Sequence, residues 1–282
     1  MAKLIIGCGY LGKRVAETWK QQGHRVFVTT RHQTRAEKLQ SEGFEPLVCD
    51  VTAPKTLADL PAVSTVLYAV GMDRTAGHSM WDVYVQGLAN VLEKLPRPER
   101  FLYVSSTSVY GQFTGEVVDE DTTPRANEGS GKIVLEAETT LLQSNPDAVI
   151  LRFAGIYGPG RVMRRQTIEA GEPVVGNPED LVNLIHVQDG VRAVLQADIY
   201  ARPGRVYNIC DGHAVTRKEL YTHLGDVLSA PTPTFVPPSA EKPAPRHAGN
   251  RQVSNKRLLE ELQFTLEYCT YRTGMPASLE NS

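Results

Sequence analysis

The feature that most constrains this chain is a glycine-rich turn that follows its first apolar run. The run "KLII" has the pattern of a buried β-strand, and Gly7, Gly9 and Gly12 then stand in G-x-G-x-x-G spacing before an amphipathic segment. The first glycine permits a tight turn, the second lets the backbone approach a pyrophosphate, and the third allows close helix–strand packing. Backbone N–H groups at the start of the helix, around Tyr10 and Leu11, favour an anion. The turn therefore predicts a dinucleotide-binding βα unit.

Short β-branched runs alternate with longer amphipathic segments through the first half of the chain. The β-branched runs lie at 3–8, 24–30, 45–50, 64–70, 100–106 and 148–153, and the amphipathic segments at 11–22, 35–43, 81–95 and 130–143. Strands that are apolar on both faces and separated by helices indicate a parallel sheet covered on two sides. Right-handed crossovers make such a sheet doubly wound. We therefore expect an α/β fold.

The pattern changes after residue 152, where glycine and proline become frequent. Segments such as "AGEPVVGNPED" and the proline-rich run 231–245 carry only short strand or helix signals, as in substrate lobes built from loops on a scaffold. Phe235 and Val236 within that run favour an ordered loop over a linker. The stretches "NLIHVQDGVRAVLQA" and "RVYNIC" have the pattern of elements that return to the sheet. We predict a cofactor-binding domain and a small discontinuous C-terminal substrate lobe, at 1–157 with 183–210, and at 158–182 with 211–282.

Composition excludes several classes of partner. A formal net charge of −2 over 282 residues gives no basic field for nucleic acid, and no apolar run approaches the ~20 residues that cross a bilayer. The four cysteines are scattered, without a C-x-x-C pair or histidines at zinc spacing, so no metal site is expected. The chain starts on a strand pattern rather than a signal peptide. These features predict a reduced, cytoplasmic protein that binds a small molecule.

The end of the second expected strand bears on the choice of cofactor. An NAD site has an acid about 20 residues after the glycine turn, which accepts from the ribose 2′-OH. That position here reads Thr29-Thr30-Arg31, and Arg35 follows one helical turn later. A guanidinium suits a 2′-phosphate, because its fork binds phosphate oxygens. We therefore favour NADP and keep NAD open. Asp50, which ends the third strand, is a candidate either for the adenine amino group or for a turn or helix cap.

Several segments together resemble the extended short-chain dehydrogenase/reductase superfamily, in its NAD(P)-dependent epimerase/dehydratase branch. They are "GCGYLG", "YVSSTSVYG", "LRFAGIYGPGR", "NLIHVQDG", "VYNICDG" and "SNKRLLEELQF", so the resemblance spans nearly the whole chain. It implies a Rossmann fold, an NAD(P) cofactor, and proton chemistry by a Tyr-x-x-x-Lys pair beside a serine or threonine. It also implies a homodimer, in which two helices, here 81–95 and 130–143, pair across the interface.

The resemblance assigns catalytic roles to particular residues and exposes one departure. Ser106 takes the hydroxyl position, four residues before Tyr110, and Lys132 takes the lysine position, where the family's lysine also binds the nicotinamide ribose. The family's tyrosine is replaced here by Glu128. A carboxyl group with a pKa near ~4.3 is a poor proton donor beside a lysine, so capping or pairing is the simpler role for Glu128. Tyr110 is the best substitute donor, or else an aromatic packed beneath the loop.

Candidate substrate contacts follow from the same resemblance. Thr107 stands beside Ser106, and the segment "GIYGPGR" matches one that lines the substrate cleft, which brings in Tyr157 and Arg161. Arg161 opens the basic cluster "RVMRR", which is either an anion site or a solvated face. Nucleotide-sugar enzymes of the family carry an arginine where this chain reads Val182-Asn183, so a full nucleotide sugar is disfavoured.

A histidine and an aspartate in "IHVQDG" could be mistaken for a catalytic pair. His186 and Asp189 lie at a strand–turn–helix junction, where we expect a structural histidine and a helix-capping carboxylate.

The sequence favours an NADP-dependent oxidoreductase that transfers hydride on a small polar carbonyl or hydroxyl substrate. Its proton would come from Tyr110 or from an ordered water. An epimerase or dehydratase is the alternative within the same superfamily. A degenerate member that binds NADP as a redox sensor, without turnover, is the alternative from another class.

Overall fold

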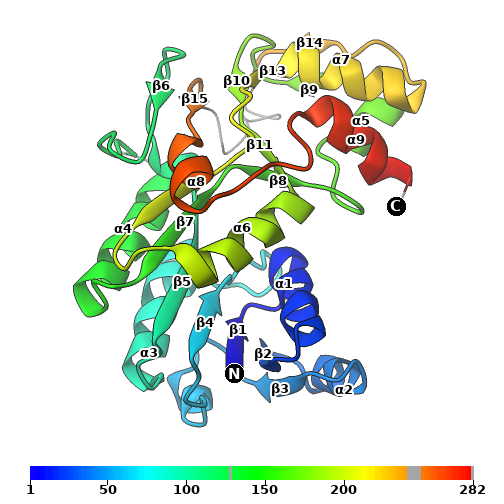
Figure 1. Ribbon diagram of the computed structural model, residues 1–282. Coiled ribbons are helices and arrows are strands. Elements are labelled where there is room, and N and C mark those ends of the chain that lie inside the picture. The colour runs from blue at the N-terminus through cyan, green and yellow to red at the C-terminus, as the bar shows by residue number, and fades with distance from the viewer. Residues whose placement is uncertain (127–128, 240–248, 281–282) are drawn as a thin grey trace. The chain divides into compact units, whose positions relative to one another are not determined.

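The computed structural model describes residues 1–126, 129–239 and 249–280 (Figure 1). The chain divides into two compact units, each assembled from separate stretches of sequence. Unit 1 comprises Met1–Ser106, Lys132–Arg152 and Val191–Tyr207, and unit 2 comprises Thr107–Gly131, Phe153–Gly190 and Asn208–Ser282. Within the described ranges, no helix combines the length and the apolar character needed to span a membrane.

Unit 1 is centred on a seven-stranded parallel sheet, which confirms the predicted doubly wound α/β fold. Its strands are β1 (Ala2–Ile6), β2 (Arg25–Thr30), β3 (Glu45–Val48), β4 (Thr65–Tyr68), β5 (Arg100–Ser106), β7 (Val149–Phe153) and β12 (Val206–Ile209). They lie in the order β12-β7-β5-β4-β1-β2-β3. The chain runs outward from β1 to β3 and then crosses back to place β4 beside β1. Ligands of such sheets bind beyond the carboxyl ends of the strands at this reversal.

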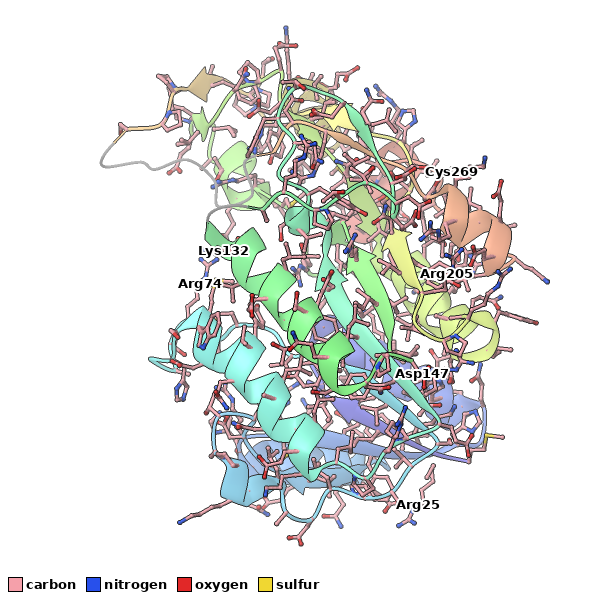
Figure 2. The ribbon with its side chains drawn as sticks, turned by 90° about the vertical axis from the view of Figure 1, so that its left-hand side faces the viewer. Arg25, Arg74, Lys132, Asp147, Arg205 and Cys269 are labelled. Carbon is pink, nitrogen blue, oxygen red and sulfur yellow. The ribbon has the colours of Figure 1, made fainter. Side chains whose placement is uncertain are left out.

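Side-chain alternation along β1 assigns the helices to the two faces of the sheet. The helices are α1 (Tyr10–Gln21), α2 (Gln33–Ser41), α3 (Gly87–Lys94), α4 (Gly129–Ser144) and α6 (Val187–Tyr200). Leu4 and Ile6 belong to the core that includes residues of α3 and α4. Lys3 and Ile5 point to the opposite face, where Lys3 meets α6 and Ile5 meets α1. Figure 2 shows α3 and α4 side by side, in cyan and green, in front of the sheet.

A charged side chain of β1 lies inside the α1/α6 face. Lys3 is only 5% exposed, and its Nζ donates to Thr65 Oγ1 and pairs with Asp198 Oδ2, both at 2.8 Å. Thr65 Oγ1 donates in turn to Asp198 Oδ1 at 2.8 Å. The ammonium also lies 5.5 Å from the ring centroid of Trp19. Because a buried charge is costly without its partners, these bonds fix α6 on β1 and β4.

The predicted helix over 81–95 begins differently from the expectation. Residues Asp82–Gln86 form one π-helical stretch, and α3 continues from Gly87. A Cβ on Gly87 would lie 2.8 Å from Val51 Cγ2, so glycine is needed for the helix to approach the segment after β3. A single π turn is the usual way in which a helix absorbs an extra residue.

A buried carboxylate joins three elements of unit 1. Glu138 on α4 accepts from Arg152 Nε at 3.0 Å and from Arg152 Nη2 at 2.7 Å, with both side chains at most 6% exposed. The Ser105 hydroxyl donates to the same carboxylate. The network holds α4, which carries Lys132, against β5 and β7.

Replacing Glu138 by Gln should remove the negative charge that lies against the buried Arg152 guanidinium. We expect the free energy of unfolding to fall by about 3 kcal/mol or more in urea titrations. Asp147→Asn is the matched control, because the Asp147–Arg97 pair is about two-thirds exposed (65% and 67%) and exposed pairs contribute little. Equal losses in the two variants would contradict the structural role given to Glu138.

Unit 2 contains short strand pairs and four helices among its described residues. Its strands are β6 (Val117–Val118), β8 (Gly155–Tyr157), β9 (Val174–Val175), β10 (Leu181–Val182), β11 (Leu184–His186), β13 (Val215–Thr216), β14 (Phe235–Val236) and β15 (Gln252–Val253). Its helices are α5 (Arg165–Glu169), α7 (Arg217–Leu228), α8 (Lys256–Glu261) and α9 (Tyr271–Glu280). β8 pairs with β11, β6 with β15 and β9 with β14 in parallel, and β10 pairs with β13 in antiparallel fashion. Thr216 and Glu219 form a capping box at the start of α7.

The structural division differs from the predicted domain boundaries. Residues 107–131, 153–157, 183–190 and 208–210 were expected in the cofactor domain but belong to unit 2. The strand pairs explain this, because β6 pairs with β15 and β8 pairs with β11. In the proline-rich run, Phe235 and Val236 form β14, while residues 240–248 lie outside the described ranges.

Candidate functional site

The glycine turn connects β1 to α1 and is shaped by two close backbone approaches. Gly7 has φ +98°, and a Cβ there would lie 2.5 Å from the Ala69 carbonyl carbon. A Cβ on Gly12 would overlap the Gly7 carbonyl oxygen. A Cβ on Gly9, in contrast, would have no neighbour within 4 Å. The first and third glycines are therefore required by packing, whereas the second leaves the backbone face open.

Two polar side chains outside the turn hold it in place. The Gly7 N–H donates to Thr29 Oγ1 at 3.1 Å, and the Arg35 guanidinium donates to the Cys8 carbonyl oxygen. Sequence reasoning treated Thr29 only as the absence of an acid. The contact could have been predicted, because β2 pairs with β1 and a threonine near the end of β2 therefore lies beside the glycine turn that follows β1. Leu11 is buried beneath the turn, and Tyr10 packs under Arg14, whose guanidinium carbon lies 4.1 Å from the ring centroid.

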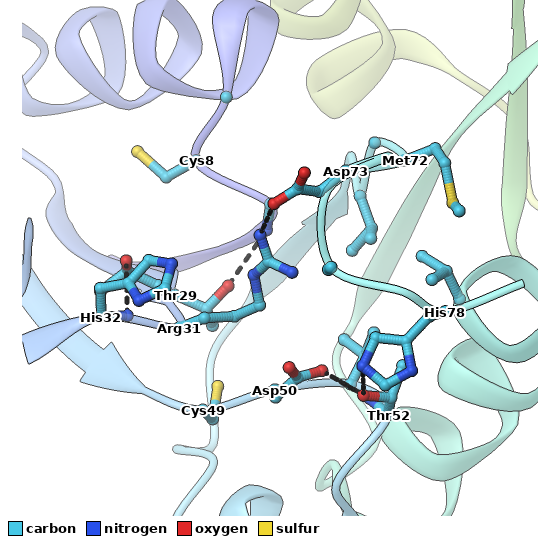
Figure 3. A pocket seen from close by; sticks show the side chains of 18 of the residues that line it. Cys8, Thr29, Arg31, His32, Cys49, Asp50, Thr52, Met72, Asp73 and His78 are labelled. Carbon is cyan, nitrogen blue, oxygen red and sulfur yellow. Dashed lines mark hydrogen bonds and ion pairs between the residues drawn. The ribbon is translucent and has the colours of Figure 1, made fainter. Parts of the chain in front are cut away.

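A cavity of about 320 Å³ opens at the carboxyl edge of the sheet in unit 1 (Figure 3). It is lined by the glycine turn, the ends of β2 and β3, and the segment after β4. The cavity includes Thr30, Arg31, Arg35 and Asp50, which the sequence assigned to the cofactor. The thiols of Cys8 and Cys49 also line it, and burial raises the pKa of each to about 11. Neither is a thiolate at neutral pH, so both cysteines are structural here.

The most prominent charged contact in the cavity was not anticipated. Arg31 Nη2 pairs with Asp73 Oδ2, and Thr75 donates to Asp73 Oδ1 through its backbone N–H (2.9 Å) and its hydroxyl (2.7 Å). Hydrogen bonds from the Thr75 hydroxyl and the Arg31 guanidinium hold the pKa of Asp73 well below its usual value. The carboxylate therefore stays ionised throughout the neutral range.

Asp50 makes the turn contacts that were one of its two predicted roles. Its Oδ1 accepts from the Thr52 backbone N–H at 2.8 Å and from the Thr52 hydroxyl at 2.7 Å. The same hydroxyl lies 3.4 Å from His78 Nε2. Thr30 is buried, and its hydroxyl accepts a long bond of 3.4 Å from the His32 N–H.

Alanine at Gly9 and at Gly12 should have opposite kinds of effect. Gly9→Ala adds a methyl to an open face, so we expect an unchanged melting temperature and at least tenfold weaker dinucleotide binding. Gly12→Ala forces the helix off the turn and should lower the melting temperature itself. Thermal unfolding and cofactor titration of both variants check this. Equal binding by Gly9→Ala and the parent chain would contradict the assignment of the turn.

The carboxyl end of β5 carries the predicted hydroxyl cluster. Ser106 is the last residue of β5 and is half-buried, and Thr107 is buried at the start of the short 3₁₀ turn Thr107–Val109. In unit 2, Tyr110 is fully buried and its hydroxyl donates to Asn208 Oδ1 at 2.9 Å. These contacts are those of the packed aromatic that was the alternative to a proton donor.

Lys132 lies in the first part of α4 and is exposed (Figure 2). Glu128, which stands in place of the family's tyrosine, lies outside the described residues.

Tyr157, expected at the substrate, is enclosed in the core of unit 2. It has no exposed surface, and a Cβ on Gly274 would lie 2.9 Å from its Cζ, so α9 packs directly on the ring. Its ring also meets His186 edge-on, with centroids 5.3 Å apart. A side chain in this position supports the fold of unit 2 and offers no surface to a substrate.

The arginines of "RVMRR" line a second cavity, of about 400 Å³, in unit 2. Arg161 and Arg164 are exposed, and Arg165 Nε pairs with Glu169 at 2.9 Å. Arg164 has φ +61°, a left-handed conformation that costs a non-glycine residue energy and is enriched at functional sites.

His186 and Asp189 connect unit 2 to its C-terminal segment. The His186 ring packs on Tyr268 with centroids 3.8 Å apart. Asp189 was expected to cap its own helix and lies in the first turn of α6. Its two carboxylate oxygens accept from the Glu267 and Tyr268 backbone N–H groups at 2.9 Å. No local pattern points to a contact 78 residues away.

Asp211, in the motif "CDG" after β12, is a buried carboxyl of unit 2. Its Oδ1 accepts from the His213 N–H at 2.9 Å, and its buried Oδ2 has no hydrogen-bond donor among the residues that the structure describes. Burial raises the pKa of Asp211 to about 7, against the opposing effect of the His213 bond. The carboxyl is thus protonated in the folded protein at a pH where the unfolded chain has lost the proton.

The raised pKa of Asp211 predicts a stability that falls with pH. Folding takes up a proton between the ordinary pKa of about 3.9 and about 7, so this contribution is present at low pH and lost as pH rises through 7. Asp211→Asn keeps the acceptor for His213 and cannot ionise. Between pH 5 and 8 its melting temperature should fall several degrees less than that of the parent. Asp226→Asn, on the exposed side of α7, should retain the parent's dependence, and an identical slope in all three proteins would contradict the assignment.

A parallel sheet in this strand order, with an open glycine turn at its reversal point, defines a dinucleotide-binding α/β protein of the Rossmann type. The model of the NAD dependent epimerase/dehydratase family matches residues 4–210. The chain belongs to that family.

Individual relatives extend over almost the whole chain. Protein YeeZ of Escherichia coli strain K12 is 29% identical over 276 residues, covering 94% of this chain and 95% of YeeZ. A solved structure of a candidate NAD-dependent epimerase/dehydratase from Methylobacillus flagellatus is 33% identical, with a TM-score of 0.76 and coverage of 99% and 97%. The dTDP-glucose 4,6-dehydratase of Bacillus anthracis, solved with NAD, has a TM-score of 0.80 at 16% identity, covering 100% of this chain and 96% of its own. That last likeness concerns the fold alone.

Proposed function

We propose that this chain binds NADP(H) and transfers hydride on a small polar carbonyl or hydroxyl compound. The observation that carries the proposal is the unit 1 cavity, in which the open Gly9 backbone and the Arg31 guanidinium line one space. When bound, the nicotinamide supplies or accepts the hydride. Membership of an NAD-dependent family supports a dinucleotide in this space.

In this proposal, different residues of the cavity bind different parts of the cofactor. Backbone N–H groups at the start of α1, around Tyr10 and Leu11, bind the pyrophosphate. Arg31 binds the 2′-phosphate, with Arg35 adding positive charge beside the turn. Asp50 borders the adenine, since its Oδ1 is already committed to Thr52 and its other oxygen remains for an amino group. NADP is preferred to NAD because no acid stands at the end of β2.

The chain's own residues would orient the substrate and move one proton. Ser106 holds the substrate oxygen, and Lys132 binds the nicotinamide ribose. An ordered water, rather than Tyr110, exchanges the proton in this proposal. The burial of Tyr110 and its bond to Asn208 support the water, because a proton donor must reach the reacting oxygen.

The proposed substrate is small and bears negative charge. Arg161 and its neighbours around the second cavity support an anion. Val182-Asn183 stands where nucleotide-sugar enzymes of the family have an arginine, and the Asn183 amide group is bonded to the backbone of Arg251 (2.9 Å) and Val253 (2.8 Å). Because these bonds already occupy the Asn183 amide group, this position is poorly suited to bind a diphosphate. Tyr157 is left out of the substrate contacts because it is buried.

An epimerase or dehydratase is the second candidate, favoured by the description of the family itself. These reactions lean more heavily on the tyrosine that Glu128 replaces. A reductase that takes its proton from water does not require a proton donor at position 128. We also propose a cytoplasmic homodimer paired through α3 and α4. The 48% exposure of Trp81, just before the π turn, supports such an interface.

The first experiment is titration of the purified protein with NADPH and with NADH at one salt concentration, followed by a carbonyl substrate screen with the tighter cofactor. We expect at least tenfold tighter NADPH binding, and turnover that falls 10²-fold or more in Ser106→Ala. Tight NADPH binding without turnover on any carbonyl would favour the redox sensor. Failure to bind either cofactor would refute the proposal.

A further inference from the structure

In the unit 1 cavity, the carboxylate of Asp73 pairs with the Arg31 guanidinium, the group proposed to bind the 2′-phosphate. Arg31 directly follows the strand β2, and Asp73 lies 42 residues later in the segment after β4. Their side chains are 35% and 37% exposed, and both line the cavity (Figure 3). The ion pair therefore lies within reach of a ligand.

Asp73 is held in this position by its own segment. Both Thr75 bonds go to Oδ1, which leaves Oδ2 directed at Arg31. The carboxylate is therefore fixed before any ligand arrives. An anion that approaches Arg31 meets both the attraction of the guanidinium and the repulsion of a fixed carboxylate.

We propose that Asp73 determines how strongly this protein selects a 2′-phosphorylated cofactor, by competing with the phosphate for Arg31. The inference rests on the proposed NADP function and adds a residue to it. NADP(H) binding exchanges one anion for another on the guanidinium, so part of the phosphate's attraction is offset by the lost Asp73 pair. NAD(H) carries no phosphate there and leaves the pair intact. Asp73 thus reduces the preference that Arg31 alone would give.

Asp73→Asn is the sharpest test, because asparagine keeps an oxygen for Thr75 and removes only the charge that faces Arg31. Titration of the intact chain should show NADPH binding three- to tenfold tighter than in the parent, with NADH binding changed less than twofold. The adenosine fragment 2′,5′-ADP should gain as NADPH does, which locates the effect at the phosphate without turnover. Asp59→Asn removes the same charge from an exposed position outside the cavity and should change neither cofactor.

A double-mutant cycle separates competition for Arg31 from simple repulsion. In an Arg31→Gln background, Asp73→Asn should improve NADPH binding by less than twofold. A gain that persists without Arg31 would overturn the exchange. Weaker NADH binding by Asp73→Asn would also overturn it, since the carboxylate would then be accepting from the ribose 2′-OH. If the parent binds neither cofactor, the proposed function fails. If it prefers NADPH and Asp73→Asn changes nothing, only the present inference fails.

Discussion

The buried carboxylate of Glu138 is the interaction on which the geometry of unit 1 most depends. It satisfies the Arg152 guanidinium through two hydrogen bonds and receives the Ser105 hydroxyl, so it joins α4 to two neighbouring strands. Lys132 lies on that helix, and Ser106 is the neighbour of Ser105 at the end of β5. Two residues proposed for catalysis are therefore attached to one polar network that contains neither of them. A buried ion pair contributes little net stability, but it specifies which arrangement of elements is acceptable.

The cofactor cavity shows the same separation between residues that build a site and residues that face its ligand. Gly7 and Gly12 are required by backbone packing, whereas Gly9 is open. Thr29 holds the turn through a hydrogen bond from the neighbouring strand, whereas Arg31, two residues later, lines the cavity with its charge. The charge on Arg31 is itself balanced by Asp73, so in the proposed function phosphate binding depends on a pair rather than on one residue.

Local sequence patterns predicted the parallel sheet, the glycine turn and the cavity residues beside it, because these follow from strand periodicity and from contacts between adjacent elements. The patterns did not predict Asp73 on Arg31 or Asp189 on the 267–268 backbone, because those partners are 42 and 78 residues away and carry no spacing signal. Tyr157 was expected at the substrate from its motif, whereas its packing on Gly274 depends on a helix more than 100 residues later. The division into units differs from the predicted boundaries for the same reason, because two-residue strands such as β6 and β15 are recognisable only from their pairing in the structure.

The contact between Lys3 and Asp198 has a consequence for the order in which the protein is made. The ammonium belongs to the third residue of the chain, and its counter-ion is synthesised 195 residues later. Until α6 has left the ribosome, β1 can join β2 and β4 only by burying an unpaired charge or by keeping that face wet. The early strands can thus form βα units during translation. The face of the sheet that carries Lys3 can exclude water only after α6, the last helix of unit 1, has been made. Lys3 thus couples the burial of one face of β1 to a helix that is made late.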